Sequence, residues 1–226
     1  MSTPIGVVRD AAFFMKVKNV KVLNETEALE IDRVKKRVRA RRNGEVSDLW
    51  LDYDKLVLAT GAKPVIPPIP NANLENIFTL HGVHDAEKIK ALLAQAKAFD
   101  VVLIGGGLIG VETTEALVQC GCRVTLVEMT PQILRVLDWE MAHLVERHME
   151  SHGVKVITNT QVTAFEGEGR VTGVLTSQGH LPADMVILGI GVRPNVDLAR
   201  AAGLQIGPTG AIKVDDTMRT SDPDIY

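Results

Sequence analysis

The chain has 226 residues, of which 46% are hydrophobic, 23% charged and 4% aromatic, and its formal net charge at pH 7 is −3. A chain of this length buries about 70% of its unfolded surface, so it can form a packed core without disulfides. The slight acidic excess excludes a general nucleic-acid or anionic-membrane binder. Hydrophobic runs are shorter than a membrane span, and the N-terminus lacks a signal-peptide pattern, so we expect a cytoplasmic protein.

The first 61 residues are predicted to form a β-meander that leads into a buried strand. Asn43-Gly44 is a strong signal for a two-residue hairpin turn. The segment from Lys55 to Thr60 is continuous and apolar, and it stops at Gly61. The expected strands cover residues 20–23, 28–31, 37–42, 45–51 and 55–60.

A proline-rich stretch at 63–70 marks the first domain boundary. Proline fixes its own φ and cannot donate a ladder hydrogen bond, so this stretch is predicted to be an extended linker. Apolar residues then recur with a helical period over 85–98. We therefore expect a linker and a helix to occupy residues 62–97.

From Asp100 onward the pattern alternates between strand and helix, which is typical of βαβ units and a parallel sheet. The expected strands are 101–104, 123–127, 154–157, 160–166, 170–176 and 185–190, and the expected helices are 108–119 and 138–151. This pattern predicts an α/β protein.

A GxGxxG motif runs from Gly105 to Gly110, after an apolar strand and at the start of a helix, which is the context that this motif requires. Gly105 permits the tight turn, Gly107 lets a pyrophosphate approach the backbone, and Gly110 lets helix and strand pack closely. The N-terminus of the helix supplies free N–H groups for phosphates. The expected dinucleotide contacts from this motif are Gly105, Gly106, Gly107, Leu108, Ile109 and Gly110.

Glu128 ends the second strand about 20 residues after the glycines, where an acidic residue can accept a hydrogen bond from a ribose 2′-hydroxyl. A carboxylate there repels a 2′-phosphate, and residues 129–132 include no lysine or arginine. We therefore expect NAD(H) rather than NADP(H), with Arg135 as the nearby basic residue that weakens this preference.

Three other patterns are interpreted as structural. A basic run between Arg33 and Arg42 lacks interleaved aromatic residues and is expected to be a solvated strand face. Of the histidines at 143, 148 and 152 on one predicted helix, only the last two share a face, and no Glu or Cys completes a metal set at suitable spacing, so no metal site is predicted. Cys120 and Cys122 are expected to be packing residues rather than a redox pair.

Three ordered motifs resemble those of the FAD-dependent pyridine nucleotide–disulfide oxidoreductases, and most closely their NADH oxidase and coenzyme A-disulfide reductase branch. The motifs are LATGAKP at 58–64, GIGVRPN at 189–195 and TSDPDIY at 220–226. The resemblance covers essentially the whole chain. It implies a Rossmann-like NAD-binding domain with a parallel sheet and β-meander, plus a partial FAD-domain segment.

The resemblance also implies roles for single residues. Thr60 and Gly61 would face FAD, Gly191 would contact the nicotinamide half of NAD, and Glu112 would lie near the nicotinamide–flavin contact. Leu108 stands where many relatives have a Phe or Tyr that covers the flavin. NADH would pass hydride to FAD, which would reduce a cysteine and then a disulfide, persulfide or oxygen.

The family's first flavin-binding motif, redox cysteine, AxGD motif and dimerisation domain are not found in the sequence. We therefore interpret the chain as part of a longer enzyme. We expect it to contain no catalytic residue of its own and to be inactive alone. Its expected partners are the dinucleotides and the missing domains of the longer chain. The alternative is a stand-alone NAD(H)-binding sensor. The expected domains are 1–61 (FAD-domain meander), 62–97 (linker and helix), 98–215 (NAD(H) binding) and 216–226 (return to the FAD domain).

Overall fold

The computed structural model describes residues 9–95 and 99–226, and the chain divides into two compact units. The first unit combines the chain up to Gly61 with residues 194–226, and the second unit comprises residues 62–193. Within the described ranges, no helix combines the length and the apolar character needed to cross a membrane.

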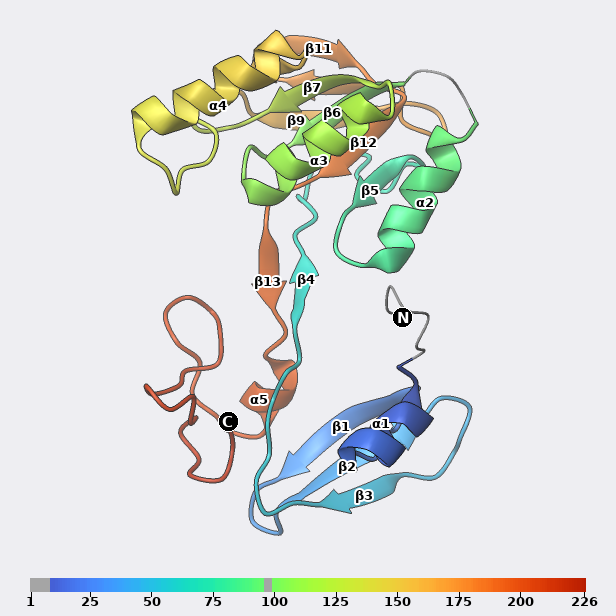
Figure 1. The fold of residues 1–226 in the computed structure, drawn as a ribbon, viewed down its shortest axis with the longest axis vertical. Coiled ribbons are helices and arrows are strands. Elements are labelled where there is room, and N and C mark those ends of the chain that lie inside the picture. The colour runs from blue at the N-terminus through green and yellow to red at the C-terminus, as the bar shows by residue number, and fades with distance from the viewer. Residues whose placement is uncertain (1–8, 96–98) are drawn as a thin grey trace. The chain divides into compact units, whose positions relative to one another are not determined.

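The second unit is built on a five-stranded parallel sheet with the strand order β5-β12-β6-β7-β8 (Figure 1). This sheet and its helices confirm the predicted α/β fold. The central strand β6 has β7 on one side and β12 on the other. The strands are β5 (Ile77–Thr79), β6 (Asp100–Ile104), β7 (Arg123–Val127), β8 (Lys155–Ile157) and β12 (Met185–Leu188).

Both faces of this sheet are buried, because alternate residues of a strand point to opposite faces. Val101 and Leu103 pack among three helices, whereas Val102 and Ile104 pack against a small antiparallel sheet of order β11-β10-β9. Burial on both faces explains the continuous apolar strands of the sequence. The covering elements are α2 (Val83–Leu93), α3 (Leu108–Gln119), α4 (Trp139–Ser151), β9 (Val162–Glu166), β10 (Gly173–Thr176) and β11 (Gly179–Pro182).

The region predicted as linker and helix contains two strands that the sequence analysis missed. β4 (Ala62–Pro64) pairs with β13 (Val192–Pro194) in a two-stranded ribbon, and β5 lies between the prolines and α2. Both β4 and β5 have only three residues, too few to show an alternating pattern. The predicted helix 85–98 is observed as α2 at 83–93, and residues 96–98 lie outside the described ranges.

The described residues of the first unit form a three-stranded antiparallel sheet of order β1-β2-β3 and two helices. Ile31 of β1 packs with Ala199, Leu204 and Ile225 in one apolar cluster. Residues 194–215 therefore lie in the first unit, whereas the sequence analysis assigned them to the nucleotide-binding domain. The elements are α1 (Ala11–Lys18), β1 (Thr26–Asp32), β2 (Arg37–Arg42), β3 (Leu49–Asp52) and α5 (Asp197–Ala201).

Several predicted strands of the first unit are corrected by the structure. Residues 20–23 are irregular rather than a strand, and they follow helix α1, which was not predicted. The β2–β3 hairpin is confirmed, but its connection covers 43–48 instead of two residues. The segment 55–60 is not a full strand, but Leu56 and Ile225 form an isolated parallel bridge, and the N–H groups of Leu56 and Leu58 donate to the carbonyls of Asp224 and Tyr226.

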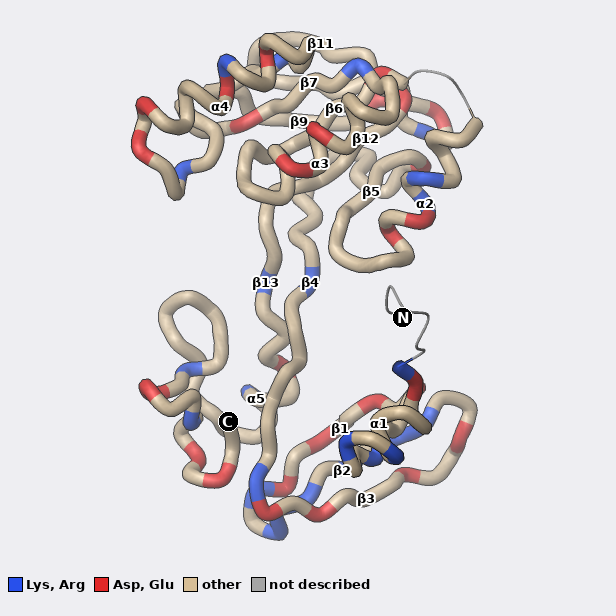
Figure 2. Tube along the Cα trace, in the orientation of Figure 1, with Lys and Arg blue, Asp and Glu red and all other residues tan. Residues whose placement is uncertain are grey.

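The basic residues of β2 pair with acidic side chains. Figure 2 shows blue and red positions near one another in the sheet of β1, β2 and β3. Asp48 accepts from both Arg39 and Arg41, at 2.8 and 2.7 Å. Arg37 bonds to Asp32 and lies over the ring of Trp50. These pairs occupy the basic side chains that the sequence analysis interpreted as a solvated face.

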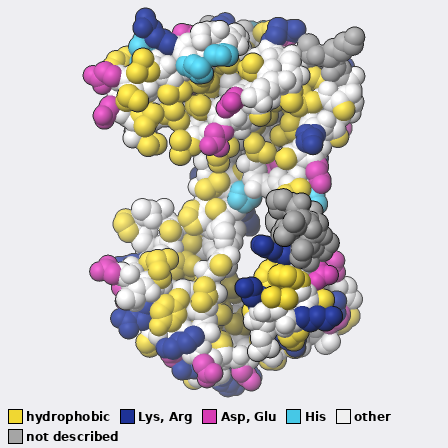
Figure 3. All heavy atoms as spheres, viewed as in Figure 1, with side chains coloured by type: hydrophobic (Ala, Val, Ile, Leu, Met, Phe, Trp, Pro, Cys, Tyr) yellow, Lys and Arg dark blue, Asp and Glu magenta, His cyan; other side chains and the backbone are white. Residues whose placement is uncertain are grey.

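Exposed apolar side chains gather over α4 and the loop before it (Figure 3). Val136, Trp139, Met141 and Leu144 are between 52% and 73% exposed. The opposite side of the helix supplies Ala142 and Met149, which are buried. Helix α4 therefore buries apolar residues on one side and also exposes apolar residues on its outer side, beside the loop that follows β7.

Asp224 provides a pH-dependent test of the first unit. Hydrogen bonds from Lys36 and then Lys55 lower the pKa of Asp224 to about 2. A carboxyl group whose pKa is depressed in the folded state stabilises above its unfolded pKa, about 3.9, and this stabilisation is lost as the pH falls toward about 2. We expect Asp224→Asn to lower the thermal midpoint at pH 7, and the difference from wild type to shrink below about pH 4.

The control is Asp216→Asn, which removes an exposed carboxylate that takes part in none of the ion pairs of the described residues. Thermal unfolding followed by circular dichroism between neutral and acidic pH makes the comparison. Equal midpoints for both variants at pH 7 would contradict a stabilising role for the two lysine pairs.

Candidate functional site

A cleft of about 910 Å³ opens at the carboxyl ends of β6, β7 and β12. The loops after these strands contribute Gly105–Ile109, Glu128 and Gly189–Gly191 to its lining. β7 and β12 flank β6 on opposite sides, so the cleft lies where the strand order reverses. Open α/β sheets bind their ligands at such a point.

The glycines of the motif satisfy different constraints. At Gly105, φ is +106° and a Cβ would lie 2.5 Å from the carbonyl oxygen of Gly189. At Gly110, a Cβ would overlap the carbonyl oxygen of Gly105, and at Gly106 it would lie 2.7 Å from Cγ2 of Ile133. At these three positions, neighbouring atoms of the protein itself leave no room for a larger residue.

Gly107 is different, because a Cβ there would meet no atom within 4 Å and its φ is ordinary. It is the N-cap of the 12-residue helix α3 and makes no side-chain cap hydrogen bond. The first N–H groups of the helix are therefore directed at open space in the cleft. This end of the helix can hold an anionic group close to the backbone.

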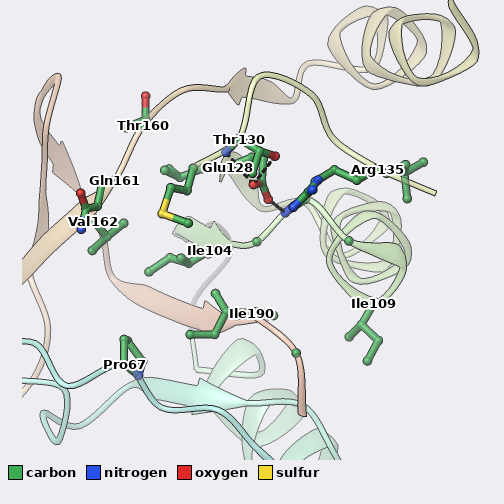
Figure 4. Close-up of a pocket in the computed structure, with 18 of the residues that line it drawn as sticks. Pro67, Ile104, Ile109, Glu128, Thr130, Arg135, Thr160, Gln161, Val162 and Ile190 are labelled. Carbon is green, nitrogen blue, oxygen red and sulfur yellow. Dashed lines mark hydrogen bonds between the residues drawn. The ribbon is translucent and has the colours of Figure 1, made fainter. Parts of the chain in front are cut away.

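Glu128 is tied to the glycine turn by its own side chain (Figure 4). Its carboxylate accepts from the N–H of Gly106 at 2.7 Å, and from the N–H and hydroxyl of Thr130 at 2.8 and 2.7 Å. Its backbone N–H donates to Ile157 of β8. A carboxylate has about four acceptor positions, so one remains for a ligand hydroxyl.

The structure brings most of the predicted site residues into this one cleft. Leu108 and Ile109 are 60% and 45% exposed at the start of α3, and Gly191, with φ of +101°, lines the same cleft. Gly110 packs beneath the turn and does not line the cleft.

Three predicted residues lie elsewhere. Glu112 lines a second groove, of about 600 Å³, between α2 and α3. Thr60 and Gly61 belong to the first unit, where they bond to Asn195. The Thr60 hydroxyl donates to the carbonyl of Asn195 at 2.6 Å, and the amide of Asn195 donates back to the carbonyl of Thr60 at 2.9 Å.

The sequence analysis missed part of the cleft wall. The omitted residues include members of the proline-rich segment, of the loops after β7 and β8, and the first residue of β9: Pro67, Pro68, Ile69, Gln132, Leu134, Val136, Thr160, Gln161 and Val162. The loops could have been found from the rule that the carboxyl ends of parallel strands surround the site. The proline-rich segment carried no such signal, since it precedes the sheet in sequence.

The remaining candidates lie outside this cleft. Cys120 is exposed and Cys122 is buried, and burial raises the pKa of the Cys122 thiol. His148 and His152 contact each other with ring centroids 4.4 Å apart. Within the described ranges, no group of three or more potential ligands is placed to hold a metal ion.

Comparison with known proteins gives consistent matches. A profile of the family described as pyridine nucleotide-disulphide oxidoreductase matches residues 6–226. The chain is 35% identical to an NADH oxidase of Methanocaldococcus jannaschii and 36% identical to an NAD(P)H coenzyme A polysulfide/persulfide reductase of Pyrococcus horikoshii. Each match covers 94% of this chain and 47% of the relative, so the chain spans about half the length of these curated relatives.

Solved structures with the same fold include proteins with similar names. An NAD-dependent persulfide reductase from A. fulgidus superimposes with a TM-score of 0.94 at 45% identity, over 100% of this chain and 41% of that one. The reduced CoADR-RHD of Bacillus anthracis gives a TM-score of 0.90 at 38% identity, over 97% and 39% of the two chains.

Gly107 and Gly110 provide a matched pair of substitutions. Gly107→Ala should cost less than about 1 kcal/mol of stability, because the added methyl group enters open space at an N-cap. It should nevertheless weaken NADH binding by roughly tenfold, since the methyl group lies where a pyrophosphate approaches.

Gly110→Ala should instead destabilise the fold by about 1–3 kcal/mol or more, because its methyl group overlaps backbone. Urea unfolding and NADH titration of both variants separate the two effects. Unchanged NADH affinity in a folded Gly107→Ala protein would contradict the assignment of the open space to a ligand.

Proposed function

Because the chain belongs to the pyridine nucleotide-disulphide oxidoreductase family, we propose that residues 62–193 bind NAD(H) as the nicotinamide-nucleotide domain of a flavoprotein oxidoreductase. One observation carries the proposal: the glycine turn at the start of α3 is hydrogen-bonded to Glu128 at the end of β7. This contact places an anion-binding helix end beside an acceptor for ribose hydroxyls.

The pyrophosphate, the adenosine ribose and the nicotinamide half of NAD(H) are each assigned to a different part of the cleft. The pyrophosphate is held at the N-terminus of α3, where Gly107 leaves room for it. The adenosine ribose is held by the remaining acceptor position of Glu128. The nicotinamide half extends toward Gly191 on the loop after β12.

The preference for NAD(H) follows from charge. The Glu128 carboxylate accepts three hydrogen bonds from neighbouring groups, which fix it in place. A 2′-phosphate brought to the same position adds a like charge at short range, which costs binding free energy.

In the longer protein, NADH supplies a hydride that the flavin accepts, and the acceptor downstream is a disulfide, a persulfide or oxygen. Support comes from relatives named NADH oxidase and NAD(P)H coenzyme A polysulfide/persulfide reductase. Thr60 and Gly61 face FAD in this proposal, and Glu112 lies near the nicotinamide–flavin contact. Leu108, exposed at the mouth of the cleft, covers less area than an aromatic residue and leaves the nicotinamide end more open.

Parallel calorimetric titrations with NADH, NADPH and FAD test the proposal. NADH should bind, NADPH should bind at least about tenfold more weakly, a difference of about 1.4 kcal/mol, and FAD should not bind to this chain. Glu128→Ala should weaken NADH binding by roughly tenfold, because a hydrogen bond to a charged acceptor is lost. Glu140→Ala, on the exposed side of α4, is the control for the loss of one negative charge.

Tight FAD binding, or binding of neither nicotinamide nucleotide, would overturn the proposal. NADH binding without any hydride transfer to added flavin or disulfide would be expected of this chain alone. The same result with a longer flavin-containing form of the protein would favour a nucleotide sensor instead of an oxidoreductase.

A further inference from the structure

Two histidine side chains meet at the C-terminal end of helix α4. His148 and His152 are four positions apart, so they lie on the same side of the helix. Both residues are exposed, and the centroids of their rings are 4.4 Å apart. Figure 3 shows histidine side chains at the surface over α4. Neither residue lines the nucleotide cleft or the groove between α2 and α3.

The end of the helix explains the direction of the second ring. The backbone N–H of His152 donates to the carbonyl of Met149, so it does not donate to the carbonyl of His148, as a continuing α-helix would require. The His148 carbonyl instead accepts from the Ser151 hydroxyl at 2.7 Å and from Nδ1 of His152 at 2.9 Å. The second ring is therefore turned back toward the first.

The same hydrogen bond fixes the proton on the ring of His152. A carbonyl oxygen can only accept, so Nδ1 carries the hydrogen, and in the neutral ring Nε2 keeps a free lone pair. Histidines that bind metals are generally held in this way, with one ring nitrogen donating to a carbonyl or a carboxylate and the other bound to the metal.

The spacing of the two rings suits one shared metal ion. Two imidazoles bound at a right angle to one ion, each with a metal–nitrogen distance of about 2.1 Å, have ring centres about 4.5 Å apart. The observed separation of 4.4 Å is close to this value. The negative end of the α4 dipole lies at the same place and favours a cation there.

We propose that His148 and His152 form a two-ligand site for a divalent transition-metal ion, with water in the remaining coordination positions. Such a site differs from the set of three or more protein ligands, which the described residues do not form. Imidazole binds Cu²⁺, Ni²⁺ and Zn²⁺, and a right-angle pair matches the tetragonal geometry of Cu²⁺ and Ni²⁺ better than the tetrahedral geometry of Zn²⁺. The inference does not depend on the proposed NAD(H) function.

Calorimetric titration with NiCl₂ of the chain, purified without a histidine tag, tests this site. Wild type should bind one equivalent of Ni²⁺. His148→Gln and His152→Gln should each weaken this binding at least about tenfold, because the loss of either imidazole removes the chelate. The matched control is His143→Gln on the same helix, whose ring stacks on Trp139 and faces Glu146. It should leave the affinity unchanged.

Three further measurements identify the ligands and the state of the fold. Cys120→Ser, which removes an exposed thiol, should leave the Ni²⁺ affinity unchanged. Electron paramagnetic resonance of the chain with one equivalent of CuCl₂ should show coupling to imidazole nitrogen, which either histidine variant should weaken. Because His148 and His152 are exposed, the thermal midpoints of the metal-free variants should equal that of wild type, and Ni²⁺ should raise the midpoint of wild type most.

No Ni²⁺ binding to wild type would overturn the proposal. Equal affinities of wild type and of both chelate variants would also overturn it, because the ion would then bind elsewhere on the protein. Loss of binding in His143→Gln would contradict a site made by the other two histidines alone. If Ni²⁺ binds as expected and NADH does not, the metal site holds and the proposed NAD(H) function fails.

Discussion

The second unit depends on the close approach of the β6–α3 turn to the end of β12. The carbonyl oxygen of Gly189 lies where a side chain on Gly105 would be, and the carbonyl oxygen of Gly105 lies where one on Gly110 would be. Only glycine permits both contacts, and without them helix α3 could not start so close to the sheet. This approach places the N-terminus of α3 at the cleft. It also places the N–H of Gly106 where it donates to the Glu128 carboxylate.

The electrostatics of the cleft are simple because few charges line it. The partial positive charge at the N-terminus of α3 favours an anion, and the Gly106 N–H and Thr130 hold the Glu128 carboxylate at a fixed position. The turn after β7, in which Leu134 has a positive φ, adds Arg135 to the lining, and among the described residues Glu128 and Arg135 are the charged ones that line the cleft. The cleft thus combines open space at Gly107 with a fixed carboxylate and a guanidinium group.

The sequence predicted the parts of this structure that depend on local pattern. Long apolar strands such as 101–104, the helix after Gly107 and the position of Glu128 follow from periodicity and from the glycine spacing. Short strands such as β4 and β5 could not be predicted, because three residues carry no period. The place of Ala199 and Leu204 in the first unit depends on a contact with Ile31, far away in sequence. The positive φ of Leu134 could not be predicted either, since burial of its side chain and the hydrogen bond from its N–H to Gly106 hold this conformation.

The central claim is that a nicotinamide dinucleotide binds where β6, β7 and β12 end, and amide hydrogen exchange with and without NADH tests it most directly. The account predicts slower exchange for the amides of Leu108, Ile109 and Gly191, which line the cleft, and unchanged exchange in β1 and β2 of the first unit. Protection confined to β1 and β2, or to the groove between α2 and α3 that contains Glu112, would contradict the claim.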